Sequence, residues 1–363
     1  MGTGLEVAVL AVMWTAVTAY ALLGGADFGA GIWDLLAGGR DRGAPRRALI
    51  EHSVGPVWEA NHVWLIFVLV LLWTAFPAGF AAISSTLYIP LTLIALGMIA
   101  RGSAFAFRKA IDQPWARRLF GAAFAFSSLV TPWFLGAAGG AVAAGRVPPG
   151  LARGDVLTSW LNPVSAVTGS FAVAACAFLA ACYLTLDARR SGDDGLTAWF
   201  GRRAVASGLV VGACSAAGLA VLHGGAPLLY GRLTGRALPL VLTAVAGGLA
   251  SLLLARLAAR PDGGRRAARP DRGRPAGRAG GTRLAAVALR LTGAGAVAAA
   301  LWAWGAAQYP YLLLPGLTVH AGAAPAAALT ATLTCAAVGG ALVIPALAWL
   351  LVLFQRSPGS ARD

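Results

Sequence analysis

Charged residues are scarce in this sequence. They make up 12% of the 363 residues, against about 25% in soluble domains. Hydrophobic residues make up 58%, and the mean hydropathy is +0.72. Too few polar side chains remain to cover a water-facing surface, so the composition excludes a soluble enzyme. It also excludes a disordered chain, because disordered segments are poor in apolar residues.

Cysteine and histidine are equally scarce. The cysteines lie inside apolar runs and form no C-x-x-C pair, so we expect small packing residues rather than disulfides or a zinc site. The sequence has no H-x-x-x-H motif, and no two histidines are expected to face each other as an axial pair. We therefore expect no metal site, no bound haem and no catalytic residue in this chain. The residues concerned are Cys176, Cys182, Cys214, Cys335, His52, His62, His223 and His320.

Lysine is nearly absent, since Lys109 is the only one among 29 basic residues. Against 14 acidic residues the net charge is +15. In a soluble protein this excess would indicate nucleic-acid binding, whereas in a membrane protein it indicates arginines in cytoplasmic loops. The hydropathy favours the second interpretation, and we expect no nucleic-acid partner.

Nine apolar runs are long enough for membrane helices, which need about 20 mainly apolar residues. They predict an all-α polytopic membrane protein, with a single integral membrane domain over residues 1–363. The first run is kept as a helix because no Lys or Arg precedes Tyr20, as the basic start of a cleaved signal would require. The predicted spans are 5–24, 56–75, 78–100, 119–142, 163–186, 203–224, 238–258, 284–306 and 327–354.

The loop charges support this count of spans. If the loops alternate sides, 25 basic residues, Arg101 among them, fall on one side and 4 on the other. Because basic loops stay in the cytoplasm, we expect the N-terminus outside a bacterial-type cell membrane and the C-terminus in the cytoplasm. The Arg-, Gly- and Pro-rich segment 259–283 is predicted to be a flexible cytoplasmic loop near anionic lipid.

Two acidic residues lie at the predicted cytoplasmic boundary. Asp27 sits in the glycine-rich segment 24–31, which predicts a bent or broken end of the first helix with close backbone approach. Glu59 follows Pro56, which is well tolerated in a first helical turn. Both carboxylates could simply cap helices. Alternatively, Glu59 and Asp27, with Asn61 and His62, form a proton-entry path; Glu59 and His62 are three residues apart and share a helix face.

Tryptophan is abundant, with twelve residues. Most lie near predicted interfaces, as expected for the aromatic belt of a membrane protein. Trp58 and Trp64 lie within two turns of Glu59, so they could instead pack around a protein–protein interface or a cofactor edge.

At these residues the chain resembles subunit II of the cytochrome bd quinol oxidases. The match rests on GADFGAG at 25–31 and more firmly on GPVWEANHVWL at 55–65. The Phe76-Pro77 break, the helix start at Leu161-Asn162-Pro163 and the Tyr309-Pro310 pair look similar too. Two positions depart from the family pattern, because Gly25 stands where a second acid is frequent and His62 often corresponds to Gln.

The resemblance implies two four-helix bundles plus one peripheral helix, paired with a similar subunit I. It implies that subunit I carries haem b, haem d and the quinol site, while this chain carries no catalytic haem. The complex would oxidise membrane quinol and reduce O2 to water, and membrane lipid and a small accessory subunit are further partners to consider. Glu59 matches the acid assigned in the family to a cytoplasmic proton route, and Asp27 matches the acid of its glycine-rich segment.

Two other classes of function remain open on the residues alone. In a proton-coupled secondary transporter, Asp27 and Glu59 would be coupling or substrate sites at broken helices near the midplane. In a non-catalytic membrane scaffold, neither acid would have a chemical role.

Overall fold

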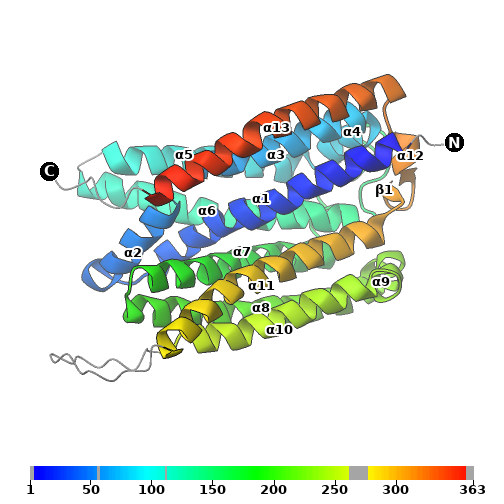
Figure 1. Ribbon diagram of the computed structural model, residues 1–363. Helices are drawn as coiled ribbons and strands as arrows, with labels where there is room; N and C mark the ends of the chain where they lie inside the picture. The colour runs from blue at the N-terminus through cyan, green and yellow to red at the C-terminus, as the bar shows by residue number, and fades with distance from the viewer. Residues whose placement is uncertain (1–3, 55–57, 111–112, 261–276, 357–363) are drawn as a thin grey trace, which may run out of the picture.

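The computed structural model describes residues 4–54, 58–110, 113–260 and 277–356. They form a bundle of long helices that run along a common direction, with a small hairpin at one end (Figure 1). The elements are α1 (Leu5–Leu35), α2 (Arg40–Val54), α3 (Trp58–Ala75), α4 (Pro77–Thr86), α5 (Tyr88–Ala110), α6 (Pro114–Ala143), α7 (Pro163–Arg190), α8 (Asp194–Gly225), α9 (Pro227–Thr234), α10 (Leu238–Ala258), α11 (Gly277–Gln308), β1 (Tyr311–Leu313), β2 (Leu317–Thr318), α12 (Val319–Gly322) and α13 (Ala326–Arg356).

The predicted all-α polytopic fold is confirmed. Within the described residues, seven helices are long and apolar enough to cross a membrane, or eight if the bent pair α3–α4 is one span. That pair is bent by 119° at Phe76-Pro77, where the sequence indicated a break. The predicted span 78–100 is divided between α4 and α5, whose apolar part covers only Tyr88–Ala104. The count of nine spans stays a prediction.

Local sequence explains where the helices begin. The Asn162 side chain accepts a hydrogen bond of 3.0 Å from the Ser165 amide, and Pro163 occupies the first turn of α7. Asp193 caps α8 in the same way, at 2.8 Å from the Leu196 amide. Such caps satisfy amide groups that have no partner within the helix. The predicted helix start at Asn162-Pro163 is therefore confirmed.

The glycine-rich segment 24–31 lies inside α1, which continues without a break to Leu35. The expected break is absent, whereas the close backbone approach predicted for these glycines is confirmed. Here the glycines serve close packing rather than bending: a Cβ on Gly29 would collide with the Cys176 carbonyl of α7, and one on Gly31 with Ser128 of α6. Small residues that let helices approach closely are a common feature of membrane bundles.

The main core surrounds α7, which lies between α1 on one side and α8 and α11 on the other (Figure 1). It buries Phe178, Leu179 and Cys182 of α7 together with Trp33 of α1 and Phe200 of α8. In contrast, leucines on α8 and α10 are largely exposed, as expected for helices that face lipid. These include Leu209, Leu242, Leu249 and Leu253.

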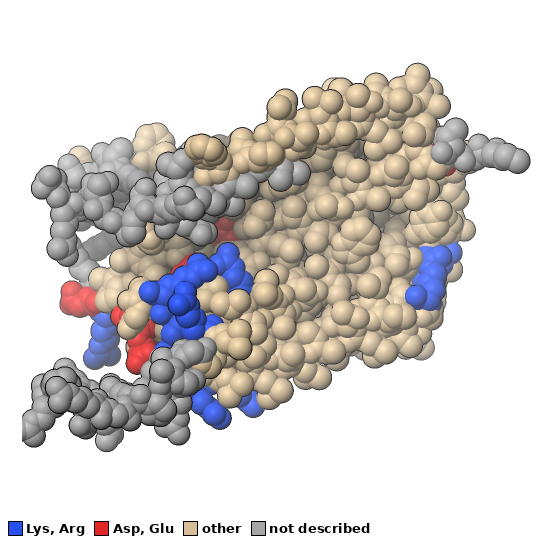
Figure 2. Space-filling model, viewed as in Figure 1, with Lys and Arg blue, Asp and Glu red and all other residues tan. Residues whose placement is uncertain are grey.

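The two ends of the bundle differ from its middle. On the face seen in Figure 2, charged side chains lie at the ends, and the band between them is nearly free of charge. We call the end that carries α2 the α2 end, and the end that carries α9, α12 and the β1–β2 hairpin the α9 end (Figure 1). An apolar band between charged ends is the pattern of a protein that spans a bilayer.

Candidate functional site

A buried ion pair joins α1 to α5. Arg101 Nη2 lies 2.7 Å from Asp27 Oδ1, and it also donates to the Asp27 carbonyl at 2.8 Å. The two side chains are only 1% and 2% exposed. Taking either charge out of water alone would cost several kcal/mol, so each depends on the other. Membrane-embedded ionisable residues of this kind are candidates for function.

Further contacts bring α6 into this site. The Arg101 guanidinium donates to the Ser128 hydroxyl, which in turn donates to the Phe124 carbonyl at 2.5 Å. The guanidinium also lies over two aromatic rings, 5.0 Å from the centroid of Phe28 and 4.2 Å from that of Phe124. Cation–π contacts are strongest where both groups are desolvated. Arg101 of α5 is therefore held by two neighbouring helices, α1 and α6.

Sequence analysis missed the role of Arg101. It assigned this residue to a cytoplasmic loop, and that assignment was wrong, because Arg101 lies inside α5 and is 1% exposed. The only sequence signal was an arginine immediately after a predicted span, followed by the further apolar residues Ala104, Phe105 and Phe107. A helix that continued through these residues would have carried Arg101 into the membrane.

Asn61 and His62 lie on α3 beside α1. Asn61 is buried, and its amide donates to the Leu23 carbonyl of α1 at 3.3 Å. The His62 ring lies 6.2 Å from Phe28 and 6.3 Å from Tyr20, centroid to centroid. It is within electrostatic reach of both Asp27 and Arg101. Three of the four residues predicted for a proton path thus lie at one α1–α3–α5 junction.

The segment around Glu59 is described only in part. Pro56 lies outside the described residues, and so do the side chains of Trp58 and Glu59, whose backbone forms the first turn of α3. Trp64 is partly buried and packs against the cluster of Tyr20, Phe28 and Cys176. Trp64 therefore contacts the residues that surround the ion pair, while the contacts of Glu59 stay a matter of prediction.

The four histidines belong to four different elements. His52 is on α2, His62 on α3, and His223 at the end of α8, 4.9 Å from the Tyr230 ring. His320 of α12 lies 3.3 Å from Glu6 of α1, at the α9 end. Among the described residues, no three His, Cys, Asp or Glu side chains form a group able to hold a metal ion. The four cysteines are unbridged.

The sequence was compared with protein families and with characterised relatives. The model of the family described as cytochrome bd terminal oxidase subunit II matches residues 5–354. Cytochrome bd ubiquinol oxidase subunit 2 of Bacillus subtilis (strain 168) is 37% identical over 115 residues, 31% of this chain and 33% of that protein. Cytochrome bd-I ubiquinol oxidase subunit 2 of Escherichia coli (strain K12) is 29% identical over 121 residues, 33% of this chain and 31% of that protein. These alignments span about a third of each relative's length.

The fold was compared with solved structures. The structure of bd oxidase from Geobacillus thermodenitrificans contains a chain that superimposes with a TM-score of 0.70. The match covers 97% of this chain and 99% of that chain at 22% sequence identity, so it is evidence for a shared fold. The family match over nearly the whole length agrees with this likeness, and the chain belongs to the cytochrome bd terminal oxidase subunit II family.

Proposed function

We propose that this chain is the haem-free subunit II of a bd-type terminal oxidase. The complex oxidises membrane quinol and reduces O2 to water, with haem b and haem d held by subunit I. The observation that carries the proposal is the family match over residues 5–354.

The proposed orientation puts the α2 end in the cytoplasm, the N-terminus outside and the C-terminus inside. The N-terminus lies at the α9 end of the bundle, and α13 runs from that end towards the α2 end (Figure 1). Termini on opposite sides need an odd number of crossings. If α3 and α5 each cross once, the described helices make nine, as the sequence predicts. With Arg101 removed from the loops, the basic residues are still divided 24 to 4.

Within the complex, the chain would supply part of a cytoplasmic proton path. Glu59 is the proposed carrier, because it lies in the first turn of α3, within reach of the cytoplasmic loops. His62 and Asn61 follow it along the same helix. Asp27 is a poor carrier, since protonating it would leave the buried Arg101 charge without a counter-ion. Its proposed role is to fix Arg101 and so set the electrostatic field at the inner end of the path.

The test is co-expression with the histidine-bearing subunit, followed by purification of the complex. We expect haem absorption bands and quinol-driven O2 uptake from the complex, and neither in stoichiometric amount from this chain alone. Reporter fusions at residues 40–47 of α2 should place this helix in the cytoplasm. A chain that purified alone and drove proton-linked solute transport in liposomes would overturn the proposal in favour of a transporter. A complex without O2 uptake would favour a scaffold.

A further inference from the structure

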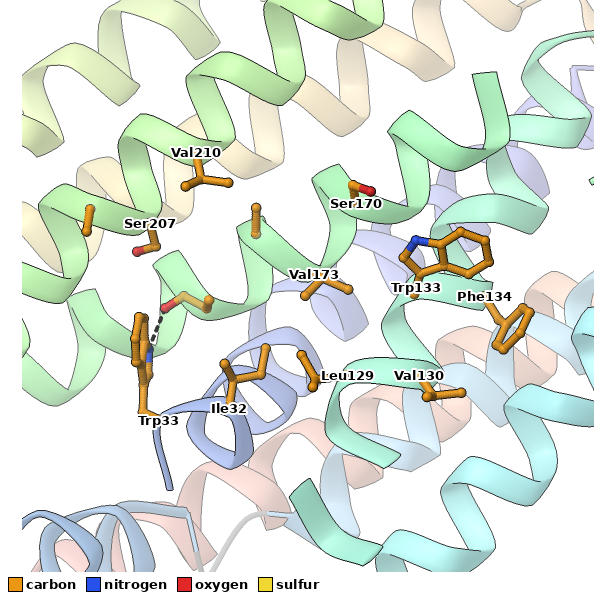
Figure 3. A pocket seen from close by; sticks show the side chains of 13 residues that line it. Ile32, Trp33, Leu129, Val130, Trp133, Phe134, Ser170, Val173, Ser207 and Val210 are labelled. Atoms are coloured by element: carbon orange, nitrogen blue, oxygen red, sulfur yellow. Dashed lines mark hydrogen bonds between the residues drawn. The ribbon is translucent and has the colours of Figure 1, made fainter. Parts of the chain in front are cut away.

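A groove of about 660 Å³ opens on the bundle between α1, α6, α7 and α8. Its walls are almost wholly hydrocarbon, from residues such as Ile32, Leu129, Val173 and Val210. Trp33 and Ser207 lie at one end, and Trp133 and Phe134 at the other (Figure 3). Along α7 the lining runs from Ser170 to Ala177, roughly 10 Å of helix. The groove therefore lies within the apolar band and is shaped for an elongated ligand.

Three of the polar groups on the wall, those of Trp33, Ser170 and Ser207, already donate to backbone carbonyls. Trp33 Nε1 donates to the Ala177 carbonyl at 2.8 Å (Figure 3). Ser170 donates to the Ala166 carbonyl at 2.9 Å, and Ser207 to the Arg203 carbonyl at 2.6 Å. These groups would not bind a polar headgroup strongly, because their donors are taken. The groove itself thus suits a hydrocarbon chain.

Two arginines lie next to the Trp33 end of the groove. Trp33 packs edge-on against Trp199, 6.3 Å between centroids. The Arg203 guanidinium lies 4.0 Å from the Trp199 ring centroid, and the Arg46 guanidinium 4.7 Å from it. Arg203 is one helical turn from Ser207 on α8, and Ser207 lines the groove. The arginines thus lie next to the groove in two ways, through the Trp33–Trp199 contact and along α8.

These two positive charges share one aromatic ring, and no carboxylate of the described residues forms an ion pair with either of them. Arg46 donates to the Ala37 carbonyl at 2.6 Å. Like charges held close together repel. An anion bound beside them would relieve this repulsion, and guanidinium groups bind phosphate well, through paired hydrogen bonds.

We propose that the groove and the Arg46–Arg203 pair form one binding site for an anionic membrane phospholipid. The headgroup phosphate binds the two guanidiniums beside Trp199, and one acyl chain lies in the groove. The site would recognise both parts of the lipid. The positive charge favours an anionic headgroup, and the apolar walls of the groove favour an acyl chain. The proposal requires that the chain be embedded in a membrane and does not depend on the chemistry of the oxidase.

The test is native mass spectrometry of the purified complex, delipidated and then titrated with phosphatidylglycerol or phosphatidylcholine. The headgroup variant is Arg46→Gln/Arg203→Gln, and its control is Arg42→Gln/Arg256→Gln, which removes the same charge from exposed positions at the same end. The groove variant is Ala206→Trp, which fills an exposed lining position, and its control is Leu209→Trp on the same helix outside the groove. Ala206→Leu provides a milder second variant if the tryptophan prevents assembly.

We expect the tightest phosphatidylglycerol site to weaken about ten-fold or more in the headgroup variant, as the loss of charge-assisted hydrogen bonds implies. The groove variants should weaken the same site, and both controls should bind as wild type does. Glycerol phosphate, which has the headgroup without chains, should not compete. Unchanged phosphatidylglycerol binding in the headgroup or groove variants would overturn the proposal. The proposal would also be overturned if the headgroup variant weakened phosphatidylcholine binding as much as phosphatidylglycerol binding. Loss of a bound quinone, rather than of phospholipid, from the variants would overturn it as well.

Discussion

Arg101 of α5 and Asp27 of α1, 74 residues apart in sequence, approach to 2.7 Å in the interior of the bundle. Both side chains are at most 2% exposed. A buried pair of this kind contributes little net stability as a pair, but it is costly to break. Substituting one residue of the pair is therefore the informative test of what the pair does for stability.

Asp27→Asn should destabilise the chain by about 3–5 kcal/mol, because it leaves the Arg101 charge buried without a counter-ion. Asp27→Leu/Arg101→Met should recover much of this loss, since it removes both charges. Thermal unfolding of the purified complex measures the effect. The matched control is Arg190→Gln, which breaks the more exposed pair with Asp187 and should cost less than about 1 kcal/mol. A double variant no more stable than Asp27→Asn would contradict this account of the pair.

Glu59→Gln should assemble and retain haem in the partner, yet reduce O2 more slowly, because the amide cannot carry a proton. Glu59→Asp should keep more activity, since it retains the acid with one methylene fewer. Quinol-driven O2 uptake per haem across pH measures this. Glu51→Gln, at an exposed position of α2, is the control and should behave as wild type. Wild-type turnover in Glu59→Gln at every pH would leave Glu59 as a helix cap.

Gly29→Ala should destabilise the α1–α7 contact, because the new methyl group would collide with the Cys176 backbone. Overpacking of this sort costs roughly 1–3 kcal/mol, and more where the backbone cannot move. Gly212→Ala on α8 is the control, since a Cβ there meets nothing within 4 Å. It should be neutral or stabilising by up to about 1 kcal/mol. Equal unfolding temperatures for the two variants would show that α1 and α7 can separate without cost.

The loop before α7 should respond to acid through Asp155. Hydrogen bonds from the Thr158 and Leu157 amides hold the pKa of this carboxyl below its ordinary value. Because the pKa is lowered, the ionised carboxylate stabilises the turn at any pH above the ordinary pKa of about 3.9. This stabilisation is lost as the pH falls through the lowered pKa of the folded protein. Hydrogen exchange at Leu157 and Thr158, corrected for intrinsic rates, should show protection that falls only in acid. In Asp155→Asn that protection should be weaker and independent of pH.

Sequence patterns predicted the long helices well, because a helix in lipid must be apolar along its length. Boundaries with strong local signals, such as Asn162-Pro163 and Phe76-Pro77, were confirmed. The short elements α2, α9 and β1–β2 were not predicted, because their mixed composition resembles that of loops. The glycines of α1 were predicted correctly as points of close approach but wrongly as a helix break, because glycine favours both and only the facing residues of α6 and α7 distinguish the two.

The candidate site was predicted only in part. Asp27, Asn61 and His62 lie at one junction. The sequence indicated this, because it placed all three residues at the same membrane boundary, where the first predicted span ends and the second begins. Arg101 was missed because a charged residue after an apolar run reads as a loop residue. Its partner is on another helix, and no local pattern reports a pairing across 74 residues. The role of Glu59 stays a prediction.

The buried pair also bears on how the protein is made. The apolar part of α5 is short, Tyr88–Ala104, and it carries Arg101. An arginine within a membrane helix costs free energy on insertion, and the cost is greatest near the bilayer centre. Both the short apolar part and its arginine make α5 a weaker candidate than the longer helices for entering the bilayer by itself. Asp27 leaves the ribosome first, already on α1, and supplies the missing counter-charge. We therefore expect α5 to insert stably only when α1 is present to pair with it, so that the first helix assists the insertion of the fifth.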